Sequence, residues 1–267
     1  MPCSKRAVER QGIGGAAGAL ATGVARQYDD APVIHVVAGA VIDAGGRVLI
    51  AQRPPGKHLA GGWEFPGGKL EPGEARAVGL ARELYEELGI EIRNPRPLIR
   101  VRHTYPYGEV LIDMWVVKSY GGSPRGLDGQ ALRWLSQGEL EKAELLPADG
   151  PIVRALRLPE RLMHLSTPDY EVVESAFPRK LLAVGENAAI DEDANGRSKL
   201  VGMFCRDGDG VVDAAEAGAD FLVMRNVLAD GELTALCDSV PVPVFARGIG
   251  LERAWALGAS GCNVMGP

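Results

Sequence analysis

The sequence predicts an α/β protein in which a three-layer α/β/α sandwich with a mixed sheet precedes a partial βα barrel. Three observations lead to this prediction. Apolar runs typical of strands flank one strongly amphipathic stretch at 75–88, a further helical pattern follows at 150–156, and short strands alternate with helices after residue 159. A chain of 267 residues with 46% apolar residues is long enough for one large domain or two small ones.

The expected elements before residue 159 follow the chain in order. A loop rich in Pro and Gly separates the first strands from the central helix. Strands are expected at 33–43 and 47–52 as a hairpin around Ala44-Gly45-Gly46, at 97–105 and 109–120 as an antiparallel pair, and at 132–135.

Residues 1–32 show no core pattern. Basic residues followed by a Gly-rich stretch resemble a signal peptide only faintly, because bulky apolar residues are scarce there. We expect a poorly ordered extension, and a misassigned start is the alternative. The expected domains are then 33–158 and 159–267.

Composition restricts the partners and the compartment. A net charge of -6 argues against a nucleic acid polymer as the partner but allows a single nucleotide held through metal ions. The cysteines are scattered without a close-spaced pair, which favours neither disulfides nor zinc and fits a reduced cytoplasm. No apolar run approaches the roughly 18 residues of a membrane span, so no membrane partner is expected.

The central helix is expected at 75–88. It follows Pro72-Gly73 and ends before Gly89, where a left-handed glycine closes a helix at least cost. Its apolar residues share one face, spaced for burial against a sheet. These residues are Ala77, Leu80, Ala81, Leu84 and Leu88.

Three carboxylates lie on or beside the opposite face of this helix. Glu83, Glu86 and Glu87 stand at positions i, i+3 and i+4, so they share a small patch. Their mutual repulsion is unfavourable unless a cation neutralises it. Hard oxygen ligands suit Mg2+ or Mn2+. The alternative is a solvated acidic face.

Residues 68–90 are identified as a Nudix box. From Gly68 the spacing is Gly, five residues, Glu, seven residues, Arg-Glu-apolar, one residue, Glu-Glu, one residue and Gly-apolar. The resemblance implies that the three Glu residues and the Gly67 carbonyl hold Mg2+, with Mn2+ as a substitute. It also implies an orienting role for Arg82 and Glu74, and makes Glu83 the leading general base.

Residues 33–157 resemble more closely the MutT-type branch of Nudix hydrolases. The resemblance rests on Arg53 and His58 with the segment 64–69, on Asp128-Gly129-Gln130, and on the segment 146–152. It implies that Asp128 is a further metal ligand and the second candidate for general base. It implies substrate contacts by Arg53, His58, Phe65, Lys69 and Asp149.

Structural interpretations of these residues stay open. Arg53 could be a surface residue, His58 a satisfied loop histidine and Phe65 simple core. Asp149 could cap the following helix. Two residues also depart from the branch, because Asp replaces Glu at 128 and Asn at 149. In this branch the Asn at the position of Asp149 recognises the oxidised base, 8-oxoguanine. An ionised Asp149 would accept a hydrogen bond from the N7-H of this base but repel its O6.

The branch implies hydrolysis of 8-oxo-dGTP to 8-oxo-dGMP and pyrophosphate, which removes an oxidised nucleotide from the pool before DNA replication. The expected partner is therefore a nucleoside triphosphate. Three alternatives remain: another nucleotide substrate, a bifunctional hydrolase and thiamine-phosphate synthase, and a noncatalytic nucleotide sensor. The oligomeric state is left open.

After residue 159 the pattern predicts βα units. Segments 217–223 and 243–249 resemble late strands of the thiamine-phosphate synthase family, but the remaining length allows only about half a barrel. Arg247 interrupts the glycine pair of its phosphate loop. We therefore expect a region that packs, binds or dimerises, with a polar loop at 184–198. Strands are expected at 161–166, 199–205, 219–223, 242–245 and 261–265, and helices at 208–217, 232–237 and 251–257.

Overall fold

The computed structural model describes residues 33–174, 199–206, 208–216 and 218–264. The expectations for residues 1–32 and for the loop 184–198 lie outside these residues. From residue 33 onward the described chain belongs to one compact unit.

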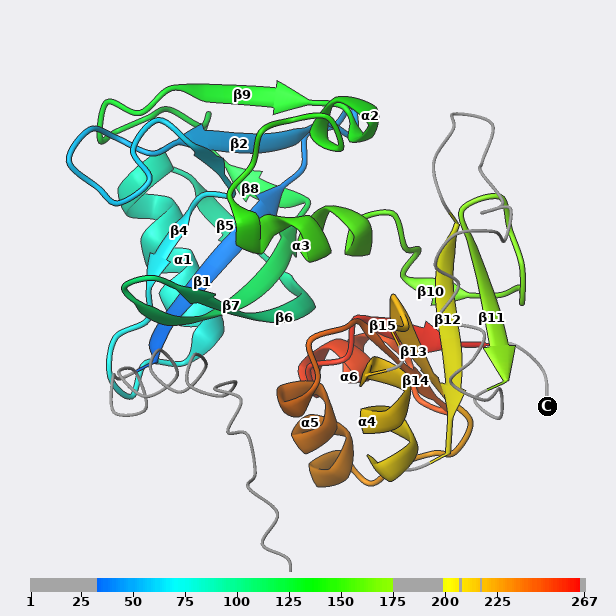
Figure 1. The fold of residues 1–267 in the computed structure, drawn as a ribbon. Helices are drawn as coiled ribbons and strands as arrows, with labels where there is room; N and C mark the ends of the chain where they lie inside the picture. Colours follow the sequence, from blue (N-terminus) through cyan, green and yellow to red (C-terminus); the bar gives the residue numbers. More distant parts are fainter. Residues whose placement is uncertain (1–32, 175–198, 207, 217, 265–267) are drawn as a thin grey trace, which may run out of the picture. The chain divides into compact units, whose positions relative to one another are not determined.

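A mixed four-stranded sheet forms the centre of the first half of this unit (Figure 1). Strand β1 runs parallel to β7 and antiparallel to β4, and β7 pairs antiparallel with β6. A second sheet has the order β3-β2-β9, and β5 pairs with β8. The bounds are Ile34–Val41 (β1), Val48–Gln52 (β2), Trp63–Glu64 (β3), Gly67–Lys69 (β4), Glu91–Arg93 (β5), Arg96–Tyr105 (β6), Gly108–Val117 (β7), Ser119–Gly121 (β8) and Leu132–Leu135 (β9).

The expected hairpin of 33–43 and 47–52 is wrong as a strand pair. The turn itself forms, and the Asp43 carboxylate accepts hydrogen bonds from the backbone N–H of Gly45 and Arg47. Beyond one bridge between Ile42 and Val48, however, β1 and β2 belong to different sheets. Because β4 and β7 occupy both edges of β1, β2 pairs instead with β3 and β9.

Helix α1, Arg76–Leu88, confirms the expected central helix. It ends at Gly89, which has the left-handed φ of 68° that glycine adopts without strain. Leu80, Leu84 and Leu88 are fully buried in a cluster with residues of β1, β2 and β7. Ala77, assigned to the same face, is exposed, so the buried stripe is narrower than the sequence indicated.

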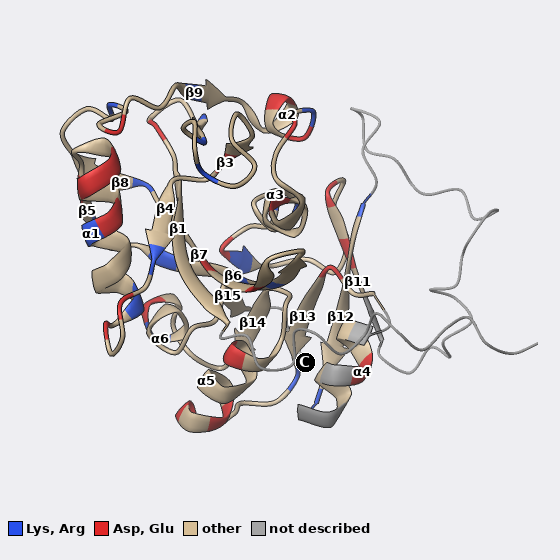
Figure 2. Ribbon diagram, turned by 60° about the vertical axis from the view of Figure 1, so that its left-hand side comes forward, with Lys and Arg blue, Asp and Glu red and all other residues tan. Residues whose placement is uncertain are grey.

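Helix α3, Gly150–Ala155, packs on the other face of the central sheet. Its Ile152, Val153 and Ala155 share a core cluster with residues of β1, β6 and β7. Figure 2 shows α1 and α3 on opposite sides of these strands. The three-layer α/β/α arrangement is therefore confirmed. Two short elements precede α3: helix α2, Gln137–Leu140, and a 3-10 turn at Pro147–Asp149.

A six-stranded parallel sheet with the order β10-β15-β14-β13-β12-β11 forms the second half. Alternation of strands and helices is confirmed, and the result is the expected half-barrel. Strand β11, at 170–174, was not predicted. The bounds are Arg161–Leu162 (β10), Tyr170–Glu174 (β11), Leu200–Cys205 (β12), Gly208–Glu216 (α4), Phe221–Met224 (β13), Asp230–Ser239 (α5), Val244–Arg247 (β14), Leu251–Ala256 (α6) and Gly261–Asn263 (β15). Among the described helices, none has the length and apolar character to cross a membrane.

Candidate functional site

A cleft of about 630 Å3 opens beside β1, β4 and α1. Its volume lies within the range of about 300–1,000 Å3 that small-molecule sites occupy. Eight residues predicted from the sequence line it, and they come from segments far apart in the chain: Arg53, His58, Phe65, Gly67, Lys69, Glu83, Glu87 and Asp149. Tyr105 and Tyr107 also line it.

Two carboxylates of α1 lie against β4 at one end of the cleft. Glu87 Oε2 accepts a hydrogen bond from the backbone N–H of Gly67 at 3.2 Å. A Cβ atom on Gly68 would lie 2.1 Å from a Glu83 oxygen, so only glycine lets this carboxylate approach the strand. Acidic residues follow one another along α1, coloured red in Figure 2.

The charge state of Glu87 reflects this crowding. Burial raises its pKa to about 7, and the Gly67 N–H and Lys57 oppose this rise. The negative charges of Glu64 and Glu83 raise the pKa further. A cation at this end of the cleft would therefore stabilise the ionised form of Glu87.

Arg82 donates hydrogen bonds to three carboxylates of the box, those of Glu74, Glu83 and Glu86. Its Nε and Nη2 donate to the two oxygens of Glu74 at 3.0 and 2.9 Å. Its Nη1 donates to Glu83 at 2.8 Å and to Glu86 at 3.2 Å. These hydrogen bonds, with Glu74 first and Glu83 next, raise the pKa of Arg82 above its ordinary value. Arg82 and Glu74 do not line the cleft, but they fix the side chain of Glu83, which does.

The donor set fits a hard divalent cation by its chemistry. Glu83, Glu86 and Glu87 offer carboxylate oxygens within a turn of helix, and a cation would offset the burial and the nearby negative charges that disfavour ionised Glu87. Within the described residues, no three His, Cys, Asp or Glu side chains converge on one point as a metal group. Glu83 and Glu86 both turn toward Arg82 instead.

Asp128 lies outside the cleft. It is exposed in the loop before β9, and its backbone N–H donates to Gln130 Oε1 at 2.9 Å. Gln130 Nε2 donates in turn to the Glu87 carbonyl oxygen at 3.1 Å, which holds this loop beside the last turn of α1. The metal-ligand role of Asp128 stays a prediction.

Aromatic side chains and an ion pair form the other end of the cleft. The rings of Tyr105 and Tyr107 stack with centroids 5.1 Å apart, and His58 meets Tyr107 edge-on at 4.2 Å. Arg53 pairs with Glu64 at 2.5 Å and donates from Nε to the His58 carbonyl at 2.7 Å. Sequence reasoning missed both tyrosines, although Tyr-Pro-Tyr-Gly at the turn between β6 and β7 marks two aromatics that can stack across one proline.

Asp149 is buried at this end of the cleft. It stands at the N-cap position of α3, as the alternative interpretation expected, but its side chain makes no capping hydrogen bond with the helix. The residue is 5% exposed, and its Oδ2 has no hydrogen-bond partner. Burial, reinforced by the charge of Glu64, raises the pKa of Asp149 well above its ordinary value. Burial thus disfavours the ionised form considered from the sequence, and a protonated carboxyl at this place could both donate and accept a hydrogen bond.

The first half of the chain is similar in sequence to known proteins. Residues 37–155 match the profile of a family described as NUDIX domain. A Mycobacterium tuberculosis protein provisionally named as an 8-oxo-dGTP diphosphatase is 43% identical over 115 residues, which span 43% of this chain and 81% of that protein. The CTP pyrophosphohydrolase of Escherichia coli is 39% identical over 46% of this chain and 90% of its own length. The 8-oxo-dGTP diphosphatase of Haemophilus influenzae is 33% identical over 48% of this chain and 93% of its own length.

Proposed function

The chain belongs to the Nudix family of hydrolases, and we propose that it hydrolyses 8-oxo-dGTP to 8-oxo-dGMP and pyrophosphate. Such a reaction would remove an oxidised guanine nucleotide before a polymerase can use it. The observation that carries the proposal is that one cleft is lined by the carboxylates of Glu83 and Glu87 and also by stacked aromatic rings and the buried carboxyl of Asp149.

Nudix hydrolases act on phosphoric anhydrides with a divalent metal, which we propose is Mg2+ here. Glu83, Glu86 and Glu87 would hold it, with the Gly67 carbonyl and Asp128 as further ligands. The bound metal would neutralise charge on the phosphates and lower the pKa of the attacking water. Lys69, at the rim of the cleft, would contact the phosphates.

Glu83 is the proposed general base. Its carboxylate lies in the cleft and is oriented by Arg82, whose guanidinium is in turn held by Glu74. Such a fixed carboxylate can take the proton of a water that attacks the β-phosphorus, and the bond from that phosphorus to the oxygen of the α-phosphate then breaks. The leaving group is the nucleoside monophosphate.

Asp149, if it is protonated in the cleft, would favour 8-oxoguanine over guanine. A neutral Asp149 can donate its O–H to O6 and accept from the N7-H that only the oxidised base carries. Unmodified guanine has a lone pair at N7, which would face the Asp149 carbonyl oxygen. Tyr105, Tyr107 and Phe65 would supply the apolar walls.

A cytidine nucleotide is the second candidate, because the 39% identical relative is named for CTP. A neutral carboxyl also complements the N3 acceptor and N4 amino donor of cytosine. The test is a hydrolysis panel of 8-oxo-dGTP, dGTP and CTP with Mg2+, with the phosphate products identified. Preference for 8-oxo-dGTP with release of pyrophosphate supports the proposal, whereas preference for CTP supports the second candidate.

For the remainder of the chain, we propose that residues 159–267 derive from a thiamine-phosphate synthase-like barrel and now serve packing. The half-barrel of parallel strands supports this origin. The two regions are joined closely at residues 158–159. Leu158, the last residue assigned to the first region, packs in a core cluster with Leu162 and Tyr170 of the second region.

A further inference from the structure

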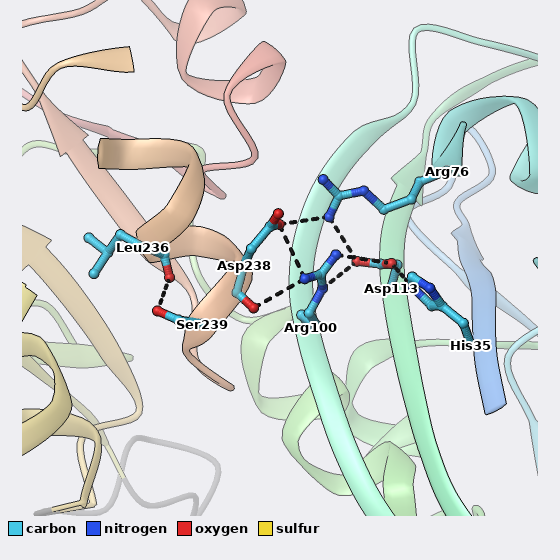
Figure 3. Close-up of polar contacts among 7 residues, drawn as sticks. All are labelled: His35, Arg76, Arg100, Asp113, Leu236, Asp238 and Ser239. Carbon is cyan, nitrogen blue, oxygen red and sulfur yellow. Dashed lines mark hydrogen bonds and ion pairs between the residues drawn. The ribbon is translucent and has the colours of Figure 1, made fainter. Parts of the chain in front are cut away.

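The half-barrel contacts the hydrolase half where α1 begins (Figure 3). Asp238, near the end of α5, accepts a hydrogen bond from Arg76 Nη1 at 2.8 Å. Arg100 Nη1, from β6, lies 3.3 Å from the Asp238 carboxylate and donates to the Asp238 backbone oxygen at 3.1 Å. One residue of the second half thus binds two arginines of the first.

Arg76 occupies an unfavourable position in its own helix. It is the first residue of α1, and the first turn of α1 holds no acidic residue. The positive end of the helix dipole disfavours a cation there. Compensation has to come from other elements, and among the described residues the carboxylates of Asp113 in β7 and Asp238 in α5 contact Arg76.

Asp113 alone cannot balance the charges at this place. It is 6% exposed, and Arg100 Nε at 2.8 Å, Arg76 Nη1 at 3.3 Å and the His35 ring all contact its carboxylate. Within the hydrolase half, two guanidinium groups therefore face one carboxylate, and one positive charge remains even with His35 neutral. Asp238 supplies the missing negative charge.

Further contacts fix how this part of the half-barrel lies. The buried Ser260 Oγ donates to the Leu98 carbonyl oxygen of β6 at 2.6 Å. Glu160 pairs with Arg96 at 3.2 Å and with Lys118 at 2.7 Å. Asp238 is thus held at a defined place against β6 and the first turn of α1.

We propose that Asp238 is a positioning residue of the hydrolase, which anchors the first turn of α1 and thereby sets where the carboxylates of the same helix stand. Arg76 and Glu83 lie two turns apart on one continuous helix, so a change in the tilt of the first turn shifts Glu83 relative to Gly68. The Glu83 carboxylate packs tightly against Gly68, because it occupies the space that a side chain at Gly68 would need. The half-barrel thus acts on turnover without touching the substrate.

The test compares Asp238→Asn with Asp230→Asn in the full-length chain. Asp230 lies on the same helix and pairs with Arg253 inside the half-barrel, so its variant removes an equal charge without touching α1. The measurements are kcat and KM for the best nucleotide of the panel, the Mg2+ concentration for half-maximal rate, and amide hydrogen exchange along 76–88. Asp238→Glu, which keeps the carboxylate, is the rescue variant.

We expect Asp238→Asn to lower kcat about three- to tenfold, which lies within the range of coupling through contiguous contacts, with KM changed less than about twofold. Exchange in the first turn of α1 should rise, Asp238→Glu should restore most of kcat, and Asp230→Asn should behave as wild type. An unchanged kcat with a lowered unfolding temperature, or an equal loss in Asp230→Asn, overturns the proposal. If no nucleotide of the panel is hydrolysed, the exchange measurement still decides, since unchanged exchange at 76–80 in Asp238→Asn refutes the anchor independently of the substrate.

Discussion

The buried carboxyl of Asp149, whose Oδ2 has no hydrogen-bond partner, leads to a measurable prediction for Asp149→Asn. The asparagine has the same shape, stays neutral at every pH and keeps one donor and one acceptor group. In the wild type, the folded-state pKa of Asp149 lies well above the ordinary value of 3.8, because burial opposes ionisation. The wild-type and variant proteins should therefore differ in how their stability depends on pH.

The sign follows from the protons bound in each state. At pH values below the ordinary pKa, Asp149 is protonated in both the folded and the unfolded chain. Its contribution to the free energy of unfolding is then fully present. As pH rises, the unfolded chain ionises first, so the folded state loses stability by about 1.4 kcal/mol per pH unit until the folded-state pKa is reached. Asp149→Asn lacks this loss and should be more stable near neutral pH, by roughly 2–4 °C in unfolding temperature for each kcal/mol.

The assay is thermal unfolding of both proteins in the same buffers at a series of pH values from about 4 upward, because the window in which Asp149 is protonated only when folded begins at its ordinary pKa. Glu144→Gln is the control, because Glu144 is exposed in the loop before the 3-10 turn. In parallel, the wild-type preference for 8-oxo-dGTP over dGTP should fall as pH rises, and the variant preference should not. A stability difference that stays constant across this range would refute the buried neutral carboxyl.

Three further outcomes are expected. Glu83→Gln should lower kcat by about two to four orders of magnitude, the usual contribution of a general base, while circular dichroism shows an intact fold; near wild-type turnover at saturating Mg2+ would exclude Glu83 as base. Gly68→Ala should also reduce kcat, because its Cβ would displace the Glu83 carboxylate, whereas Gly138→Ala, with open space around its Cβ, should not. A chain of residues 30–158 contains all the cleft residues but should unfold at a lower temperature than the full-length protein, because Arg76 and Arg100 lose their ion pairs with Asp238. Equal unfolding temperatures in a calorimetric scan would contradict this.

The sequence by itself determined the features that depend on local spacing. The apolar stripe of α1, its closing Gly89 and the carboxylates at 83, 86 and 87 follow a helical period, so their spacing can be recognised in the sequence without knowledge of any tertiary contact. The antiparallel pair β6 and β7 was predicted from two apolar runs around a turn, and the βα units after residue 159 from strand patterns that alternate with helical patterns. The family resemblance then supplied the roles of the box residues.

Only the tertiary structure decided what depends on burial and on residues distant in the chain. Asp149 has the same local sequence whether its side chain caps α3 or lies buried in the cleft, and the surrounding packing selects between the two. The hairpin of β1 and β2 was lost because β4 and β7, later in the chain, occupy both edges of β1. Arg76 likewise looks misplaced at a helix start until Asp238, 162 residues away, supplies its counter-charge. Local periodicity cannot encode such contacts, because their strength depends on which distant groups fold against them.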